Sequence, residues 1–273
     1  MNREEFINNR VKEHYNYIKE KYDVVYLGLQ GSQNYELDVY DKDYKSDIDT
    51  KAIILPSFED FVYNRQPVSR TIVLDNNEHI DVKDIRIIFD TFKKQNVNFI
   101  EILFTKYKII NEEYKDLIQF LLDNKEMIAR LNENQALRCM AGMSMEKLKA
   151  LQHPYPTIID KINKYGYDPK QLHHILRMND FIKKYATGAR YEDCLIPDNK
   201  EYLIEIKKGF LSEKEAVELA QKTDAETKQI KDKYINEKDI VSEYAIEILT
   251  KTKLDILTRK FKKELLKNQE SKW

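Results

Sequence analysis

Two segments decide the fold of this chain, namely Leu29-Gln-Gly-Ser-Gln-Asn-Tyr-Glu-Leu37 and Ser46-Asp-Ile-Asp-Thr-Lys-Ala-Ile-Ile-Leu55. An apolar run leads into Gly31-Ser32, and a second apolar run follows the pair Asp47 and Asp49. Alternate side chains of a strand leave on the same face, so Asp47 and Asp49 would project together. Two adjacent carboxylates repel each other unless a cation lies between them, and divalent cations prefer oxygen ligands. Because the Gly-Ser turn can point backbone N–H groups at an anion, the pattern predicts a phosphate held by a metal ion and a turn.

The composition describes a globular protein with a substantial core. The chain has 273 residues, of which 42% are hydrophobic and 34% charged, with 46 basic and 47 acidic residues. This balance argues against wholesale non-specific binding of nucleic acid. No long apolar run and no signal-peptide pattern occurs, so we expect a cytoplasmic protein without membrane association. Cys139 and Cys194 are far apart in the sequence and fit reduced thiols better than a disulfide or a zinc site.

Hydrophobic periodicity predicts an α+β fold with two domains. We expect strands at Val24–Leu29, Asp47–Leu55, Arg70–Leu74 and Glu78–Val82, helices at 3–21 and 84–94, a short helix at 57–64, a polar loop at 38–45, and a strand or short helix at 101–107. Helical patterns follow at 111–130, 132–151, 169–186, 198–208, 213–233 and 237–267. The sequence therefore predicts a domain of strands and helices in residues 1–110 and an all-helical domain in residues 111–273.

The order of these motifs resembles the nucleotidyltransferase superfamily related to DNA polymerase beta. In that superfamily Gly-Ser is followed by Asp-x-Asp at the start of a hydrophobic strand, and a further acid lies on a neighbouring strand. Here Gly31-Ser32 precede Asp47-Ile48-Asp49, and Asp81 lies on the predicted strand 78–82. The resemblance implies the nucleotidyltransferase fold, which is a small mixed sheet with flanking helices.

A narrower resemblance covers roughly residues 25 to 220. The segment from Tyr165 to Arg177 is similar to the Gly-Tyr-Asp-x-Lys-x-x-x-His-x-x-Arg signature of a predicted nucleotidyltransferase family linked to RNA repair. Asn98 and Glu101 match an Asn and a Glu that follow the sheet in that family. Glu36 departs from it, because the family often has Gly after the Tyr that corresponds to Tyr35.

The resemblance implies a mechanism with two Mg²⁺ ions, which Mn²⁺ can replace. Asp47, Asp49 and Asp81 would be the catalytic carboxylates and metal ligands, and Asp81 would accept the proton of the acceptor hydroxyl. Gly31 and Ser32 would hold the terminal phosphates of a nucleoside triphosphate such as ATP. Asp84 is the alternative to Asp81, although it is also placed to cap the helix that begins beside it.

Three basic side chains share one stripe of the predicted helix 169–186. Asp168 fits the N-cap and Pro169 the first helical position, which fixes the register of the helix. Offsets of four and seven residues then place Lys170, His174 and Arg177 together. Three donors on one face suit a triphosphate or a nucleic-acid backbone, and we expect this face to close over the carboxylates of the sheet.

Each of these motifs also has a structural interpretation. Alternating acids on a strand are often solvated, and a basic helix stripe is often salt-bridged. We interpret His173 as structural and Asn98 and Glu101 as helix-end groups. His14, His79 and His153 receive no role, and Tyr35 could line the nucleotide pocket. The basic stretch from Arg259 to Lys267 fits a solvated helix face or an RNA contact.

The first functional hypothesis is an Mg²⁺-dependent nucleotidyltransferase. It would transfer a nucleoside monophosphate from an NTP to a hydroxyl acceptor, with an RNA end as one candidate, and release pyrophosphate. The second is a nucleotide- or RNA-binding module of the same fold, a sensor or antitoxin-like protein without turnover. A third is an RNA-binding or structural protein whose acids are incidental. The sequence names neither the acceptor, the preferred NTP nor the oligomeric state.

Overall fold

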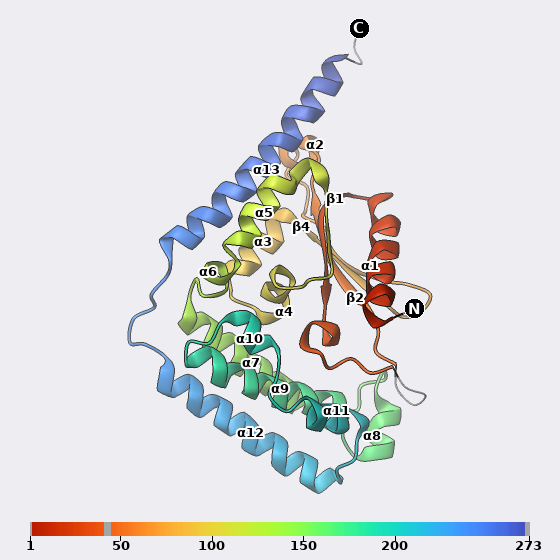
Figure 1. Cartoon of the computed structure of the whole chain (residues 1–273), viewed down its shortest axis with the longest axis vertical. Helices are drawn as coiled ribbons and strands as arrows, with labels where there is room; N and C mark the ends of the chain where they lie inside the picture. The colour runs from red at the N-terminus through yellow and green to blue at the C-terminus, as the bar shows by residue number, and fades with distance from the viewer. Residues whose placement is uncertain (1, 41–44, 271–273) are drawn as a thin grey trace. The chain divides into compact units, whose positions relative to one another are not determined.

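The computed structural model describes residues 2–40 and 45–270, without the side chains of residues 269 and 270. The part of the predicted polar loop at residues 41–44 lies outside this range. The first elements are α1 (Arg3–Lys19), β1 (Asp23–Gln30), a 3₁₀ helix (Ser32–Tyr35), β2 (Asp49–Leu55), α2 (Phe58–Val62), β3 (Ser69–Val73), β4 (His79–Asp84), α3 (Ile85–Lys93), α4 (Val97–Ile100), a 3₁₀ helix (Glu101–Leu103) and β5 (Lys108–Ile110). The rest of the described chain is helical (Figure 1). Its elements are a 3₁₀ helix (Glu112–Tyr114), α5 (Lys115–Asp123), α6 (Lys125–Ala129), α7 (Glu133–Ala150), α8 (Ile159–Tyr165), α9 (Pro169–Ala186), α10 (Tyr191–Leu195), α11 (Lys200–Lys208), α12 (Glu213–Tyr234) and α13 (Glu243–Glu270).

The sheet has five strands in the order β3-β4-β2-β1-β5. β1 is antiparallel to β2 and to β5, and β3 and β4 form an antiparallel hairpin. β2 and β4 are parallel, with Lys51 opposite Asp81. The sheet is therefore mixed, and the α+β class predicted from the sequence is confirmed.

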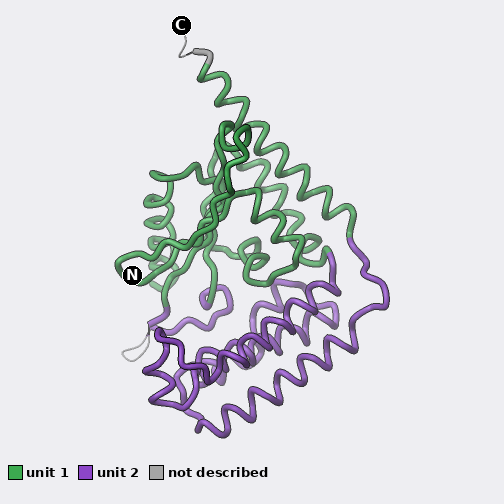
Figure 2. The backbone as a smooth tube through the Cα atoms, turned by 180° about the vertical axis from the view of Figure 1, so that it is seen from behind, with its two compact units in different colours: residues 1–31, 47–131, 242–273 green, residues 32–46, 132–241 purple. Residues whose placement is uncertain are grey.

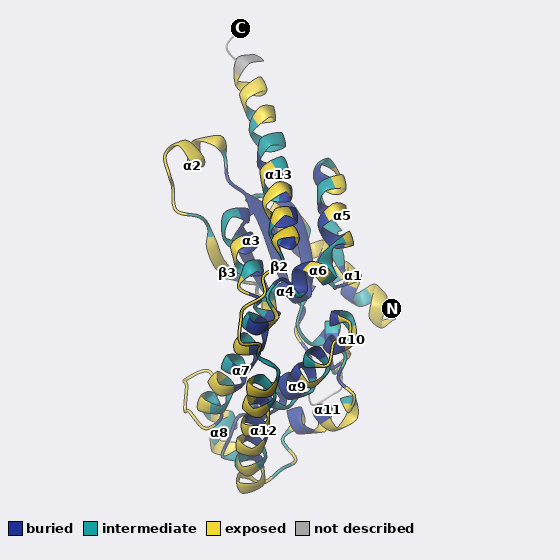
Figure 3. Ribbon diagram, turned by 90° about the vertical axis from the view of Figure 1, so that its left-hand side faces the viewer, coloured by how far each residue is buried: buried dark blue, intermediate teal, exposed yellow. Residues whose placement is uncertain are grey.

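Helices cover both faces of this sheet. The six inner positions of β1 are buried, which requires cover on both sides. Figure 1 shows α1 on one face and α3 and α5 on the other, and Figure 3 shows the central strands as buried. The core on the α1 side gathers twelve buried residues, namely Ile7, Val11, Ile18, Val24, Leu27, Leu29, Ile48, Ala52, Ile54, Ile80, Val82 and Tyr107. The even-numbered positions of β2 and β4 face α1, which leaves the odd-numbered positions for the opposite face.

The chain forms two compact units, which Figure 2 colours separately. Unit 1 contains residues 1–31, 47–131 and 242–273, and unit 2 contains residues 32–46 and 132–241. This division differs from the predicted boundary after residue 110. α13 packs against α3, α5 and α6, so the last helix belongs with the sheet although it follows the helical region in sequence.

Local signals placed most element ends correctly. α9 spans the predicted residues, and the side chain of Asp168 accepts a hydrogen bond from the Lys170 N–H as its N-cap. Other predictions were wrong in detail. β2 begins at Asp49, two residues later than predicted, and residues 237–242 are not helical. Of the strand or short helix expected at 101–107, the structure has the short helix, a 3₁₀ turn at Glu101–Leu103, followed by a loop before β5. The short helices α8 and α10 have too few turns to show a period.

Candidate active site

The site begins at the turn after β1. Gly31 has φ of +96°, in the region that favours glycine, while the space around it would admit a Cβ. The conformation of the backbone therefore selects glycine here. Its N–H donates to Oε1 of the buried Glu101 (3.2 Å), and Gln30 lies opposite Asp49 in the antiparallel ladder. The turn and Asp49 thus lie at the same end of the sheet.

Three of the charged side chains lie on one face of two neighbouring strands. Asp49 and Lys51 are two residues apart on β2, and Asp81 is the partner of Lys51 on β4. Paired residues of adjacent strands point to the same side, so Asp81 shares the face of Asp49. Strands rise about 3.3 Å per residue and lie about 4.8 Å apart, so the Cα atoms of Asp49 and Asp81 are roughly 8 Å from each other.

His79 holds the carboxylate of Asp49. Its backbone N–H donates to Asp49 Oδ1 at 2.9 Å, and its Nδ1 lies 3.1 Å from the same oxygen. Two donors on a single oxygen fix the orientation of the carboxylate. No role for His79 is evident from the sequence. Its position two residues before Asp81, on the same strand face, was the signal that could have identified it.

Asp81 is held by two lysines. Lys51 Nζ lies 2.5 Å from Asp81 Oδ2, and Lys83 Nζ lies 2.9 Å from Oδ1. Burial would raise the pKa of Asp81, but the two ammonium groups outweigh it and hold the pKa below its usual value. Burial lowers the pKa of Lys51, and Asp81 opposes that shift. The side chain of Lys51 is 3% exposed, and its Nζ lies 3.9 Å from the centroid of the Phe99 ring.

Asp47 and Asp84 are the other two acids that the sequence proposed for the site. Asp47 is exposed and lies before the start of β2. Asp84 is buried and caps α3, because its side chain accepts from the Arg86 N–H (2.8 Å) and from the Arg86 guanidinium (2.6 Å). It pairs in register with Ile54, on the α1 side of the sheet. The capping interpretation of Asp84 is confirmed, and this carboxylate does not share the face of Asp49.

A buried polar network lies behind Asp49, on the α1 side. His14 Nε2 lies 2.9 Å from Glu78 Oε2, and its Nδ1 lies 2.9 Å from Thr50 Oγ1. Arg10 Nε donates to the same Glu78 oxygen at 3.0 Å. Burial would raise the pKa of Glu78, but the hydrogen bonds from His14 and Arg10 lower it to about 2. His14 therefore joins β2 to the residue that precedes β4, beside the site, a role that its isolated place in the sequence did not indicate.

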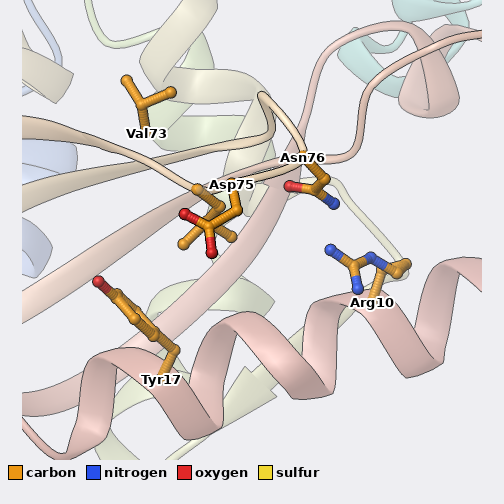
Figure 4. A pocket seen from close by; sticks show the side chains of 6 residues that line it. Arg10, Tyr17, Val73, Asp75 and Asn76 are labelled. Atoms are coloured by element: carbon orange, nitrogen blue, oxygen red, sulfur yellow. The ribbon is translucent and has the colours of Figure 1, made fainter.

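A pocket of about 400 Å³ lies between α1 and the turn that joins β3 to β4. Figure 4 shows Arg10 and Tyr17 on α1, with Asp75 and Asn76 on the turn. None of the predicted site residues lines it.

The three predicted carboxylates do not form a ready metal site. Among residues 2–40 and 45–270, no group of three or more His, Cys, Asp or Glu side chains is placed to hold a metal ion. Asp47 and Asp49 are chemically suited to one divalent cation. Asp81 does not fit the same role in this arrangement, because ammonium groups lie against both of its oxygens.

Unit 2 holds the predicted basic stripe on α9. Lys170 is exposed, His174 is partly buried, and Arg177 is buried with its guanidinium carbon 4.0 Å from the centroid of the Tyr35 ring. Burial lowers the pKa of His174 well below its usual value, with the nearby charges of Arg177 and Lys170 adding to the effect. His174 can therefore offer a hydrogen bond but little positive charge at neutral pH. The structure brings Arg177 next to the loop that follows Gly31.

The neighbouring His173 is structural, as its position indicated. It is buried, and its Nδ1 donates to the Leu203 carbonyl at 2.9 Å. Burial lowers its pKa to about 3, and the nearby Lys207 contributes in the same direction. Lys207 itself lies 3.4 Å from the Leu37 carbonyl and 3.5 Å from Ser46 Oγ.

Glu36 adopts a backbone conformation that is unusual for a residue other than glycine. Its φ is +58°, in the left-handed region where glycine is favoured. Its carboxylate makes an ion pair with Lys200 at 2.5 Å. The loop therefore keeps the backbone conformation that a glycine would adopt, with a non-glycine residue in it.

No helix in the described part of the chain is both long and apolar enough to cross a membrane. No family model matches the sequence, and no curated protein matches it either. Among solved structures, the chain is similar to a nucleotidyltransferase-like protein from Exiguobacterium sibiricum 255-15, with 11% identity and a TM-score of 0.30 over 93% of this chain and 89% of that one. A similarity this low does not assign the fold or the function. Both are inferred from the residues themselves.

Proposed function

We propose that this chain is an Mg²⁺-dependent nucleotidyltransferase that moves a nucleoside monophosphate from an NTP to a hydroxyl acceptor. The observation that supports it most is the meeting of the Gly31 turn with Asp49, with Asp81 on the same face of the next strand. A glycine turn at the end of a strand, beside two carboxylates on one face of the sheet, suits a metal-bound triphosphate. The acceptor oxygen would form a bond to the α-phosphorus, and the bond to pyrophosphate would break.

Asp47 and Asp49 are the residues that would hold Mg²⁺, which would neutralise charge on the phosphates. His79 would keep Asp49 in position for this role through its two donors. The sequence pattern adds Asp81 as a third ligand and as the acceptor of the hydroxyl proton. Its two lysines keep it ionised, which a proton acceptor requires, but they also lower its basicity.

The phosphates would be bound by the turn and by the basic residues of α9. Gly31 and Ser32 would donate from the backbone and the hydroxyl, with the Gly31 N–H exchanging its Glu101 acceptor for a phosphate oxygen. Lys170 and Arg177 would supply positive charge, and His174 would act as a neutral hydrogen-bonding group. An RNA end remains our proposed acceptor class, and it rests on the signature around these residues.

The direct test uses labelled NTPs, Mg²⁺ and pooled RNA or protein acceptors. We expect transfer by the wild type and at least a 100-fold loss in the double variant Asp47→Ala/Asp49→Ala. Asp75→Ala, which removes an exposed acid in the β3–β4 turn, is the matched control. If the double variant transfers label as fast as the wild type, the assignment of the carboxylates is wrong.

The ion pairs of Asp81 also support a second candidate, a module that binds a nucleotide without turnover. A carboxylate committed to two lysines need not serve in catalysis. Calorimetry would then show NTP binding that depends on Mg²⁺ and on Asp47 and Asp49, while no pyrophosphate is released. Release of pyrophosphate with an added RNA acceptor would exclude this candidate.

A further inference from the structure

Lys51 occupies an unusual position for a lysine. It lies on the strand face that carries Asp49 and Asp81, its side chain is 3% exposed, and it contacts Asp81 directly. Lysine is seldom this buried unless it has a partner. The ring of Phe99 covers the ammonium group, which separates the pair from water.

Stability alone is a poor explanation for such a pair. A buried ion pair loses much of its Coulomb energy to desolvation, and apolar residues of similar size often serve as well. Lys83 already pairs with the other oxygen of Asp81, so a second lysine is not needed to avoid an unpaired charge. Lys51 contacts one predicted metal ligand, Asp81, and lies two residues from another, Asp49, which calls for a different role.

We infer that Lys51 takes the place of one metal ion at Asp81, so that the site works with a single divalent cation held by Asp47 and Asp49. This inference rests on the proposed function and specifies its metal requirement. A divalent cation shared between Asp49 and Asp81 would have to lie beside the Lys51 ammonium group, which repels it strongly where water is excluded. Since Lys51 is covalently part of β2, its charge is present at any Mg²⁺ concentration.

The inference can be tested by counting metal ions, without measuring activity. Mn²⁺ bound to the protein with a non-hydrolysable NTP analogue is quantified by electron paramagnetic resonance. We expect one Mn²⁺ per protein–nucleotide complex in the wild type and a second in Lys51→Met, where Asp81 becomes accessible to an ion. Methionine keeps the length of the side chain and its contact with Phe99.

Three further variants separate the role of Lys51 from general effects. Lys83→Met is the matched control, because it removes the other lysine of Asp81, and we expect one ion. Lys51→Arg keeps the charge and should also bind one ion. In Lys51→Met/Asp81→Asn the second ion should be lost again. Thermal unfolding of each variant reports whether it is folded.

Two ions in the wild-type complex would overturn the inference while leaving the proposed function intact. One ion in a folded Lys51→Met protein would overturn it as well. If Lys51→Met does not fold, the number of Mn²⁺ ions bound by the wild type and by Lys51→Arg still tests the inference. Two ions in either protein would contradict it. Failure of the wild type to bind the nucleotide at all would remove the proposed function and the inference together.

Discussion

His79 and Asp49 form the contact on which the geometry of the site most directly depends. One oxygen of Asp49 accepts hydrogen bonds from both the backbone N–H and the ring Nδ1 of His79, which fixes the orientation of the carboxylate. Partners of this kind usually matter nearly as much as the ligands they hold. His79 therefore belongs to the candidate site as a positioning residue.

Replacement of His79 by alanine should weaken Mn²⁺ affinity by about 10- to 100-fold, because Asp49 loses one of its two donors. The backbone N–H of residue 79 remains in this variant, so the protein should fold. Titration of Mn²⁺ by electron paramagnetic resonance measures the effect. His153→Ala, at an exposed position, should bind like the wild type. Equal affinity in the two variants would show that His79 does not position Asp49.

Glu78 should make stability depend on acid pH. Its pKa is about 2 in the folded protein against 4.5 for an ordinary glutamate, so folding favours its ionised form. Its contribution is fully present above about pH 4.5 and is lost as the pH falls toward 2, with roughly 3 kcal/mol as an upper estimate. Glu78→Gln should be less stable at pH 7 and should lose less stability between pH 5 and pH 2.

The measurement is denaturant unfolding at several pH values in this window. Glu20→Gln, which changes an exposed acid at the end of α1, serves as the control and should follow the wild type. A Glu78→Gln protein with an unchanged pH dependence would contradict the role given to the His14 and Arg10 hydrogen bonds.

At the scale of elements, the residues at the start of α9 fix the register of the whole helix. Asp168 caps its first turn and Pro169 follows at the first helical position, where its missing N–H costs nothing. The register set there determines that Arg177 lies on a buried stripe of the helix. The cap thus affects the part of α9 proposed to bind phosphates.

Loss of the cap should destabilise this helix. We expect Asp168→Ala to lower the free energy of unfolding by about 1 to 2 kcal/mol, and Asp168→Asn to lower it by less, because asparagine also caps helices well. Circular dichroism during denaturant unfolding measures both. Asp160→Ala, in the first turn of α8, is a control for removal of an acid. Equal stabilities of the alanine and asparagine variants at residue 168 would exclude the capping explanation.

At the scale of the whole molecule, the loop between β1 and β2 belongs to unit 2, although it joins two strands of unit 1. Within unit 2, Lys207 contacts the Leu37 carbonyl and the Ser46 hydroxyl, and Val39 closes the loop through two hydrogen bonds with Ser46. The helical unit therefore supports the segment that connects the Gly-Ser turn to the two aspartates.

Lys207→Met should loosen this loop without unfolding either unit. We expect hydrogen exchange at the Leu37 and Val39 amides to accelerate by about 10-fold, the effect of losing about 1.4 kcal/mol of local stability. Hydrogen-exchange mass spectrometry of the intact chain measures it. Lys214→Met, at an exposed position on α12, should leave exchange in the loop unchanged. Unchanged exchange in Lys207→Met would show that Lys207 does not support the loop.

Much of the fold could be predicted because its signals are local. Periodicity and caps placed α1, α3, α9 and α12, and the turn at 75–77 identified the β3–β4 hairpin. The pattern Gly31-Ser32 with Asp47 and Asp49 predicted a turn and two aspartates close together, and the structure has Gly31 and Asp49 at one end of the sheet. Short elements such as α8 and α10 were missed, since five to seven residues are too few to show a helical period.

By itself, the sequence determined the α+β class, the register of α9 and the cap at Asp84, because each depends on residues a few positions apart. Only the tertiary structure decided what surrounds the carboxylates. Lys51 meets Asp81, and His79 meets Asp49, each across thirty positions of sequence. These contacts require the parallel pairing of β2 with β4, which long-range burial selects and no local pattern encodes. Because of this pairing, Asp81 forms an ion pair with Lys51, so that of the three predicted metal ligands only Asp47 and Asp49 remain suited to a cation.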